Sequence, residues 1–343
     1  MSKIGIGMAI GFSEESTYGT AAGTVDNYLH TFPGQESLKR TTETIEGDDL
    51  QARGIDSTLV DGGGRSVAGP LQADLQYGGG WLLFLAQLLG IDPTTAGAGP
   101  YTHTCSIGGA LGTGSDNRSK GITLFVDREG MTASASAKTA AYKGIKPTAC
   151  EIAFGYNARA RATFDLVGQD FSAWGARLSP TLPSRGWIIS PSKATTPTTF
   201  LTYNGTSYTC RAASIRIEQE LDLENRDLQA RTMGQPNPNA RMKVTGSFTV
   251  EAPETGASSG GAFWDDYNDK THRAIVMTAE GATPTDEKLL LTIPDALITK
   301  PGEPEISGPG TVLYTAEFEG YYDSGTSEIA SLVLTSLDSA AWA

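Results

Sequence analysis

The sequence has few of the residues that catalysis and disulfide bonding require. It contains three histidines and three cysteines in 343 residues, and charged residues make up only 19%. Three cysteines cannot all pair within one chain, and Cys105, Cys150 and Cys210 lie far apart. A disulfide framework is therefore excluded, and we expect buried thiols in a reducing compartment. The few histidines leave little material for general-base or zinc chemistry.

Long apolar segments and catalytic motifs are also missing. The longest apolar run, Trp81 to Ile91, is about half as long as a bilayer-spanning helix, and the start MSKIGIGMAIGF lacks the cleavage pattern of a signal peptide. We therefore expect no membrane insertion. No GxSxG, HExxH or GxxxxGK[ST] motif occurs, and no GxGxxG follows a strand. We expect no enzymatic activity and no cofactor.

Three short features allow a functional interpretation, and each has a simpler one. His103 and Cys105 are spaced like two metal ligands on a strand, but no third ligand is near in the sequence, so ordinary strand residues are the better interpretation. The Gly-rich stretch at 62–65 lacks the following helix that a phosphate cradle needs, which favours a hairpin or flexible loop. The carboxylates from Glu218 to Glu224 share one face, unlike the opposed acids of a glycosidase.

Glycine, proline and threonine are abundant, with 41, 17 and 40 residues. This composition suits many short strands and turns and excludes a helical bundle or coiled coil. The hydrophobic share of 39% is large enough to form cores. Alternation of apolar and polar residues predicts strands at Ser214–Asp227, Arg241–Ala252, Arg159–Val167 and Met131–Tyr142.

Two helices are expected among these strands, one at Trp81–Leu89 and a shorter one near Phe263. Trp81, Phe84 and Leu88 are assigned to the core rather than to an interface by their i, i+3, i+7 spacing. The predicted fold class is mostly β, with antiparallel sandwiches or partial barrels that each carry one short helix.

The chain also repeats itself. The sequence DLQAR at Asp49–Arg53 recurs at Asp227–Arg231, 178 residues later (227 − 49). VAGPL at Val67–Leu71 is matched by VTGSF at Val244–Phe248, 177 residues later (244 − 67). A Gly-rich turn and a bulky amphipathic segment follow each copy. Copies of roughly 130 to 150 residues have the size of single domains, not of solenoid repeats.

We therefore expect two tandem lobes, at residues 36–177 and 201–343. The Pro-, Ser- and Thr-rich segment 178–200 is predicted to be a linker, because its composition favours extended chain. Residues 1–35 are predicted to be an N-terminal arm that becomes ordered only against another surface.

Several segments, taken in order, resemble the major tail proteins, or tail tube proteins, of long-tailed bacteriophages, in the form with two tube lobes in one polypeptide. The resemblance covers essentially the whole chain and depends on the order and duplication of loose patterns. The segments that carry it are EESTYGT at Glu14–Thr20, the stretch from Glu36 to Arg53, the Gly69 strand with the helix after it, YTH at Tyr101–His103, and VTGSFTVE at Val244–Glu251.

This resemblance implies a self-assembling structural protein in the tail of a virion, assembled in the host cytoplasm for a long non-contractile tail. Stacked rings would have a continuous β-barrel as their inner wall, through which the genome passes without stable binding. Three chains with two lobes each are implied to form a pseudo-hexameric ring. Tape-measure, tail tip and terminator proteins are the implied partners.

The charge of the chain gives this picture a physical role. Lys and Arg number 26 and Asp and Glu 39, so the net charge is −13, and three chains at −13 each carry −39. Carboxylates on the inner wall would repel DNA phosphates within a Debye length of ~8 Å. The lumen candidates are Glu218, Glu220, Asp222, Glu224, Ser134 and Ser136. An outward solvated face, or pairing of these acids with Arg159 and Arg161 of a neighbouring lobe, stays open as the alternative.

Loops near the two DLQAR copies, at 47–65 and 225–241, are expected to order against the neighbouring ring, as is the N-terminal arm. The candidates for ring and stack interfaces are Tyr18, Asp49, Gln51, Arg53, Arg159, Arg161, Asp227, Gln229 and Arg231.

Other classes share parts of this composition. A capsid decoration protein or a receptor-binding β-sandwich would also be acidic and rich in Thr and Gly. The repeated lobes with matched loops favour the tube subunit, because they suit quasi-equivalent packing. Tubes of contractile and secretion machines are a neighbouring interpretation, and the two-lobe length argues against them.

Overall fold

The structure is a computed structural model of a mostly β chain. It describes residues 9–29, 36–46, 50–51, 54–55, 60–78, 80–108, 119–127, 139–175, 178, 188–191, 199–224, 232–251, 261–303 and 312–339. Ser134, Ser136, the whole of the second DLQAR copy and all of the first except Leu50 and Gln51 lie outside the described residues.

The elements fall into two halves of the chain. Those of the first half are β1 (Ile10–Glu14), β2 (Asn27–Leu29), β3 (Lys39–Glu46), β4 (Leu50–Gln51), β5 (Gly54–Ile55), β6 (Val60–Asp74), α1 (Leu82–Leu89), β7 (Thr94–Ala96), β8 (Tyr101–Ile107), β9 (Ile122–Asp127), β10 (Thr139–Gly155), β11 (Arg161–Gly168) and β12 (Asp170–Gly175). Those of the second half are β13 (Leu201–Tyr203), β14 (Thr206–Tyr208), β15 (Cys210–Glu218), β16 (Lys243–Glu251), α2 (Gly261–Asp269), β17 (Arg273–Glu280), β18 (Lys288–Lys300), β19 (Leu313–Gly320) and β20 (Ala330–Ser336).

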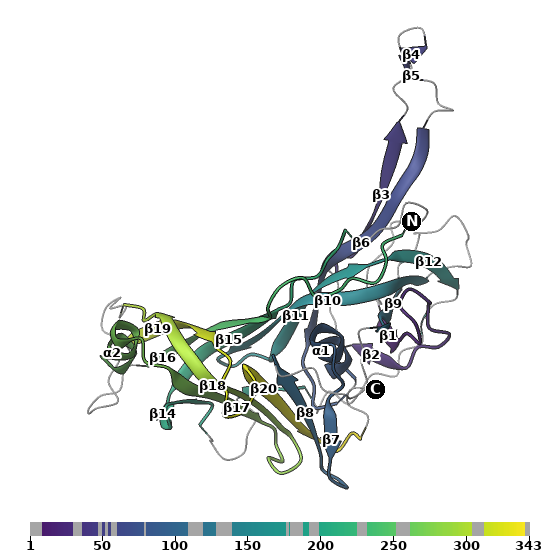
Figure 1. The fold of residues 1–343 in the computed structure, drawn as a ribbon. Coiled ribbons are helices and arrows are strands. Elements are labelled where there is room, and N and C mark those ends of the chain that lie inside the picture. The colour runs from purple at the N-terminus through teal and green to yellow at the C-terminus, as the bar shows by residue number, and fades with distance from the viewer. Residues whose placement is uncertain are drawn as a thin grey trace.

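One antiparallel sheet runs through both halves in the order β3-β6-β11-β10-β15-β16-β19-β18. We call it the long sheet. Its first four strands come from the first half, its last four from the second, and the pairing of β10 with β15 joins them (Figure 1). The pairings of the described strands branch but do not close into a ring, so the long sheet is open.

The two halves share one topology. The N-terminal part of β10 leaves the long sheet and pairs with β9 and β12, and β9 leads on to β1 and β2. In the same way β18 pairs with β17 and β20, and β17 leads on to β13 and β14. The first half adds the hairpin β7–β8, which pairs with β20 and so ties the halves together a second time.

A phenylalanine from the helix fills the space between the layers of each half. The ring of Phe84 on α1 lies 5.1 Å from that of Phe12 on β1 and 4.8 Å from that of Phe164 on β11. Phe263 on α2 lies 5.1 Å from Tyr203 on β13 and 5.4 Å from Phe248 on β16. Each helix is therefore a plug that buries aromatic surface against both layers.

Both predicted helices are present, but the second, with nine residues, is not shorter than the first, with eight. Every residue of α1 is buried, and Trp81, Phe84 and Leu88 belong to the core, as their spacing predicts. The run LLFLAQLL has no β-branched residue to oppose a helix, and Gly90 ends it in the left-handed conformation, donating its N–H to the Ala86 carbonyl. The second helix, α2, contains Phe263.

Three expectations about local structure need correction. The glycines at 62–64 are part of the long strand β6, because pairing with β3 continues past them, so they are not a turn. β15 ends at Glu218 instead of continuing to 227; beyond it, Leu221 keeps a bridge to Pro238. Of the three thiols, those of Cys105 and Cys150 are buried, but Cys210 is partly exposed.

Parts of the predicted arm and linker pack within the chain. β1 pairs with β9 and β2, and Ile10 and Phe12 are buried, so residues 9–29 need no second surface to become ordered. In the linker, Ile189 is buried and donates its N–H to the Leu75 carbonyl, while its own carbonyl accepts the N–H of Ala160. The apolar pair Ile188-Ile189 accounts for this packing inside a segment otherwise rich in Pro, Ser and Thr. The remaining lobe boundaries stay a prediction.

Candidate assembly surface

The long sheet has one covered face and one open face. Side chains alternate along its strands, and in β15 Ile215 and Ile217 are buried while Ser214 and Arg216 on the opposite side are partly exposed. The helix plugs and the second layers pack on the buried side. We call the other side the open face; it is the part of the molecule where polar residues of six neighbouring strands meet.

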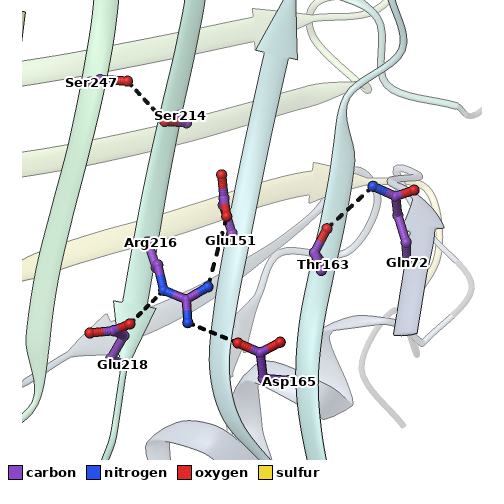
Figure 2. Close-up of polar contacts among 8 residues, drawn as sticks. All are labelled: Gln72, Glu151, Thr163, Asp165, Ser214, Arg216, Glu218 and Ser247. Carbon is purple, nitrogen blue, oxygen red and sulfur yellow. Dashed lines mark hydrogen bonds and ion pairs between the residues drawn. The ribbon is translucent and has the colours of Figure 1, made fainter. Parts of the chain in front are cut away.

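A single arginine surrounded by carboxylates lies at the centre of the open face (Figure 2). Arg216 on β15 donates to Glu218 on its own strand and to Asp165 on β11 at 2.8 Å, and its guanidinium lies 3.8 Å from Glu151 on β10. The hydrogen bond to Glu218 is the main reason that the pKa of the Arg216 guanidinium is raised above its usual value. Three carboxylates around one guanidinium leave a local charge of about −2 at neutral pH.

Hydroxyl pairs cover the surface around this cluster. Ser214 and Ser247 lie 3.1 Å apart between β15 and β16, and Gln72 donates to Thr163 at 3.4 Å between β6 and β11 (Figure 2). These side chains bond to one another, so they present hydroxyl and amide groups without charge on this part of the open face.

Other cations along the long sheet also lie beside carboxylates. Lys243 on β16 is 3.9 Å from Glu319, and Lys300 at the end of β18 is 3.0 Å from Glu317. Toward the β3 end of the long sheet, the Asp74 carboxylate on β6 binds both Arg159 and Arg161. These two arginines are predicted from the sequence to lie at an interface. In the structure each forms an ion pair with the Asp74 carboxylate of its own half, at 2.9 Å for Arg159 and 3.3 Å for Arg161.

The long sheet ends in two strands with an unpaired edge. β3 pairs with β6 on one side, and no described strand pairs with its other side. At the opposite end, residues Leu297–Lys300 of β18 pair with β19 on one side, while β17 stops at Ala296 on the other. Unpaired N–H and C=O groups at such edges are templates for pairing with another chain.

The four acidic lumen candidates do not share one strand. Glu218 lies on the open face in the Arg216 cluster. Glu220, Asp222 and Glu224 are exposed and follow the end of β15, where Asp222 donates its N–H to the Asn237 carbonyl. Ser134 and Ser136 lie outside the described residues, as do Asp49, Arg53, Asp227, Gln229 and Arg231. Gln51 belongs to β4, which pairs with β5 at the tip of the β3–β6 hairpin (Figure 1).

The N-terminal motif forms a buried polar cluster. The Glu15 carboxylate is fully buried and accepts hydrogen bonds from the Thr123 hydroxyl and from the N–H groups of Gly144 and Gly19, at 2.7 to 2.9 Å. Burial raises its pKa above the usual range. Tyr18, an interface candidate, packs beside this cluster with its hydroxyl buried and its pKa raised by burial. These groups hold the N-terminal segment on the first half.

No described cluster has the arrangement of a metal site. His103 is buried, its Nδ1 bonded to the Thr95 hydroxyl and its Nε2 to the Asp338 carbonyl. Within the described residues, no group of three or more His, Cys, Asp and Glu side chains could hold a metal ion. The conspicuous features are instead a polar face and two open strand edges.

Sequence reasoning missed Arg216, Glu151 and Asp165, which form the charged centre of the open face. Each stands at a polar position of an alternating strand, which is a detectable signal. Their meeting depends on the register of β11, β10 and β15, and Arg216 and Asp165 are 51 residues apart in the sequence. Strand alternation assigns a residue to a face but does not pair it.

One sheet that runs through two like halves and ends in strands without a further described partner is suited to a structural protein that assembles with other copies. The family model for the phage tail tube protein matches residues 5–320, and the chain belongs to this family. It is a structural subunit of a tail tube and hence a virion tail component that assembles with itself. No curated protein matches the chain. None of the described helices is long and apolar enough to cross a membrane.

Proposed function

We propose that three copies of this chain close each ring of the tube by continuing the long sheet from one copy to the next. The observation that carries this proposal is the β10–β15 seam. β10 in the first half corresponds to β18 in the second, and β15 corresponds to β3. The edges that join the halves inside one chain are therefore the counterparts of the two edges that remain open at its ends, and β18 reaches to Lys300, the counterpart of Ala149 where the internal pairing begins. Pairing of β18 with β3 of the next copy repeats the internal seam.

The open face of the long sheet forms the inner wall of the proposed ring. The helices and second layers lie on the opposite side, where they can remain outside a closed barrel. The inner wall then carries Arg216 within its three carboxylates and the hydroxyl pairs around it. Sheet closure also removes both open edges, which explains why free edges are tolerated in the subunit.

Passage of DNA follows from the charges on this wall. The Arg216 guanidinium is already bonded to carboxylates, so it offers phosphates no free cation. The excess of carboxylate repels phosphates over roughly a Debye length, ~8 Å at physiological salt. The exposed Glu220, Asp222 and Glu224 add negative charge beyond the end of β15. The genome is thereby kept from binding as it moves.

The rest of the assembly follows from this role. Rings stack into a tube through the β3–β6 hairpin and the residues near the DLQAR copies, and tape-measure, tail tip and terminator proteins contact its lumen and its ends. Assembly takes place in the host cytoplasm, for a long non-contractile tail.

Electron cryomicroscopy of tails from phage particles that carry this chain tests the proposal. We expect three copies in each ring, with β3 of one copy beside β18 of the next and the open face toward the pore. A tail tube built from another chain, or a ring in which the open face points outward, would contradict it. A solitary decoration or receptor-binding module would give no rings.

The charge of the inner wall has its own test. The triple variant Glu151→Gln, Asp165→Asn, Glu218→Gln leaves the Arg216 cation without carboxylate partners, and we expect its tubes to retain DNA in a filter-binding assay at low salt. Adding Arg216→Gln to the triple variant provides the matched control and should remove this retention. Equal DNA binding by wild-type and triple-variant tubes would reject the role of the carboxylates.

A further inference from the structure

The seam inside one chain is a template for the seam between two copies. There Arg216 of β15 lies opposite Glu151 of β10. Its side chain also crosses β10 and reaches Asp165 on β11 at 2.8 Å (Figure 2). A cation of the second half is thus held by carboxylates on two strands of the first half.

A constant offset relates the strands that begin each half. In the first half Lys39 of β3 lies opposite Ala68 of β6, and in the second half Arg216 of β15 lies opposite Thr245 of β16. The differences 216 − 39 and 245 − 68 both equal 177. Adding 177 therefore converts a residue of β3 or β6 into its counterpart in β15 or β16.

Similar offsets relate the strands that end each half. Lys146 of β10 lies opposite Val167 of β11, and Leu297 of β18 lies opposite Glu319 of β19. The offset is 297 − 146 = 151 for β10 and β18, and 319 − 167 = 152 for β11 and β19. Both pairings also have a register shift at the equivalent step, so the offsets describe matching backbone geometry.

These offsets place particular residues at the seam between copies. Lys39 takes the position of Arg216. On the other copy, Glu317 takes the position of Asp165. Gly302 lies two residues beyond the end of β18, beside Thr315 as Glu151 lies beside Thr163, but its φ of 70° is left-handed, so the chain is no longer extended there.

We infer that Lys39 of one copy forms an ion pair with Glu317 of the next copy across Gly302, in the place that Arg216 and Asp165 occupy inside the chain. This inference rests on the ring proposed above and names its contact. Lys39 is exposed and has no ion pair among the described residues, so its charge is available to a second copy.

The acceptor side of this contact is also accessible. The Glu317 side chain is 49% exposed and holds Lys300 at 3.0 Å, which leaves room for a second cation beside it. Gly302, beyond the end of β18, has no side chain to block the path of Lys39 toward Glu317. The seam between copies therefore has fewer carboxylates around its cation than the internal seam, where Arg216 has three, and it is the weaker of the two.

The contact also fixes the register of the new strand pair. In an antiparallel pair, a slip that keeps each residue on its own face moves the partner by two positions. Such a slip would place Thr41 or Ser37 opposite Gly302 and move the lysine away from Glu317. Only the register of the internal seam brings the two charges together.

Charge reversal tests the ion pair in the full-length protein. Lys39→Glu places two carboxylates at each seam, and we expect the concentration for half-maximal ring formation to rise about tenfold or more, read by sedimentation velocity and negative-stain microscopy. The double variant Lys39→Glu, Glu317→Lys restores opposite charges and should regain most of the loss. Lys270→Glu is the matched control: it makes the same charge change directly after the end of α2, where Lys270 contacts the Tyr267 ring, and should leave ring formation unchanged.

The outcomes separate the ion pair from the ring. Wild-type rings that are unaffected by Lys39→Glu, or a double variant that assembles no better than the single variant, would overturn the ion pair and leave the ring intact. A wild-type chain that forms no ring in solution or in tails would overturn both. The thermal unfolding temperature of each variant shows whether the subunit itself is intact.

Cross-linking tests the register by a separate route. The offsets place Thr41 of one copy opposite Lys300 of the next, as Glu218 lies opposite Ala149 inside the chain. Thr41→Cys with Lys300→Cys should give disulfide-linked oligomers up to trimers after oxidation, because residues paired across strands are within reach of a disulfide. Each single cysteine variant is a control and should give none. Rings of the double cysteine variant that do not cross-link would show that the register is different.

Discussion

The two halves of the chain have the same topology but are covered to different degrees. α1 is buried along its whole length, whereas α2 exposes 37% of Trp264. The segment between β15 and β16 folds back on the first half, where Thr232 forms a bridge with Arg65 and the Met233 carbonyl accepts a hydrogen bond from Gln169. The equivalent β3–β6 hairpin instead extends away from the body (Figure 1).

This difference shows what a tandem repeat does in one polypeptide. The first half has its neighbour within the chain and is partly covered by it. Exposed aromatic residues occur on both halves: Tyr156 follows β10 in the first half, and Tyr321 and Tyr322 lie in the connection between β19 and β20. Tyr321 donates its N–H to the Asp295 carbonyl just as Gln169 donates its N–H to the Lys143 carbonyl in the first half. Gln169 contacts the Met233 carbonyl of the second half inside the chain. In the proposed ring, Tyr321 would make the equivalent contact with a second copy.

The interiors of the halves differ as well. In the second half Tyr203 donates to Asp266 at 2.7 Å, and Arg273 holds the same carboxylate at 3.1 Å. The corresponding positions in the first half carry Phe12, Gln87 and Ile122. A charged network in the second half thus stands where the first half has two apolar residues and Gln87.

The largest effect is expected from emptying the two aromatic plugs. Phe84→Ala and Phe263→Ala should each lower the free energy of unfolding by about 3–5 kcal/mol, because each leaves a large cavity between two layers. Since the β10–β15 seam joins both halves in one sheet, each variant should shift one common transition in urea, followed by circular dichroism and tryptophan fluorescence. Two separate transitions, each sensitive to only one variant, would show that the halves unfold independently.

The polar network of the second half should matter next. Asp266→Ala removes the acceptor of the buried Tyr203 hydroxyl and the partner of Arg273, and we expect a loss of about 1–3 kcal/mol. Gln87→Ala changes the corresponding position of α1 and should cost less, because Gln87 donates to Glu14 at 3.5 Å, a longer bond than those that Asp266 accepts. Urea midpoints of the two variants make the comparison. A larger loss for Gln87→Ala would show that the halves do not differ in this way.

The Glu15 cluster, in turn, belongs to the first half. Glu15→Ala leaves a hydroxyl and two N–H groups without their acceptor, and a loss of about 1–3 kcal/mol is expected at acidic pH. Because the pKa of Glu15 is raised in the folded state, the folded protein binds a proton at Glu15 more tightly than the unfolded protein does. The stability that it contributes is present below its unfolded pKa and decreases as pH rises through its folded pKa. The variant should therefore lose less at neutral pH.

Unfolding curves of wild type and Glu15→Ala across pH 4 to 8 measure this dependence. The difference between the two should shrink as pH rises. A difference that grows with pH would mean that the carboxylate is stabilised as the anion, with its hydrogen bonds outweighing the cost of burial.

The smallest effect is expected from chemical labelling of the three cysteines. Burial raises the pKa of Cys105 to about 12 and that of Cys210 to about 11, and it raises that of Cys150 as well. Cys210 is partly exposed, so it should react first with a thiol reagent at pH 8, while the other two react after denaturant is added. Counting modified thiols by mass spectrometry checks this. Labelling of Cys150 before Cys210 would show that the β10–β15 seam opens in the native state.

Prediction from the sequence succeeded where the signal is local. The run LLFLAQLL gave a helix because its apolar residues fit no strand alternation, and polar alternation placed β11 and β16. It failed at the glycines of β6, because a glycine run permits a turn but does not require one, and pairing with β3 kept it extended. It also predicted β15 too long, because the alternation of apolar and polar residues continues beyond Glu218. The strand ends there because its partner strand β16 begins only at Lys243, opposite Glu218.

The sequence by itself determined the repeat, the two helices, the β class and the acidic balance, since each is written in residue order and spacing. Only the tertiary structure decided which strands are neighbours. It brought Arg216 to Asp165 and Glu151, joined β10 to β15, and left β3 and the end of β18 unpaired. The physical reason is that pairing between strands far apart in the chain depends on register and on the packing of the whole core, which no local pattern specifies.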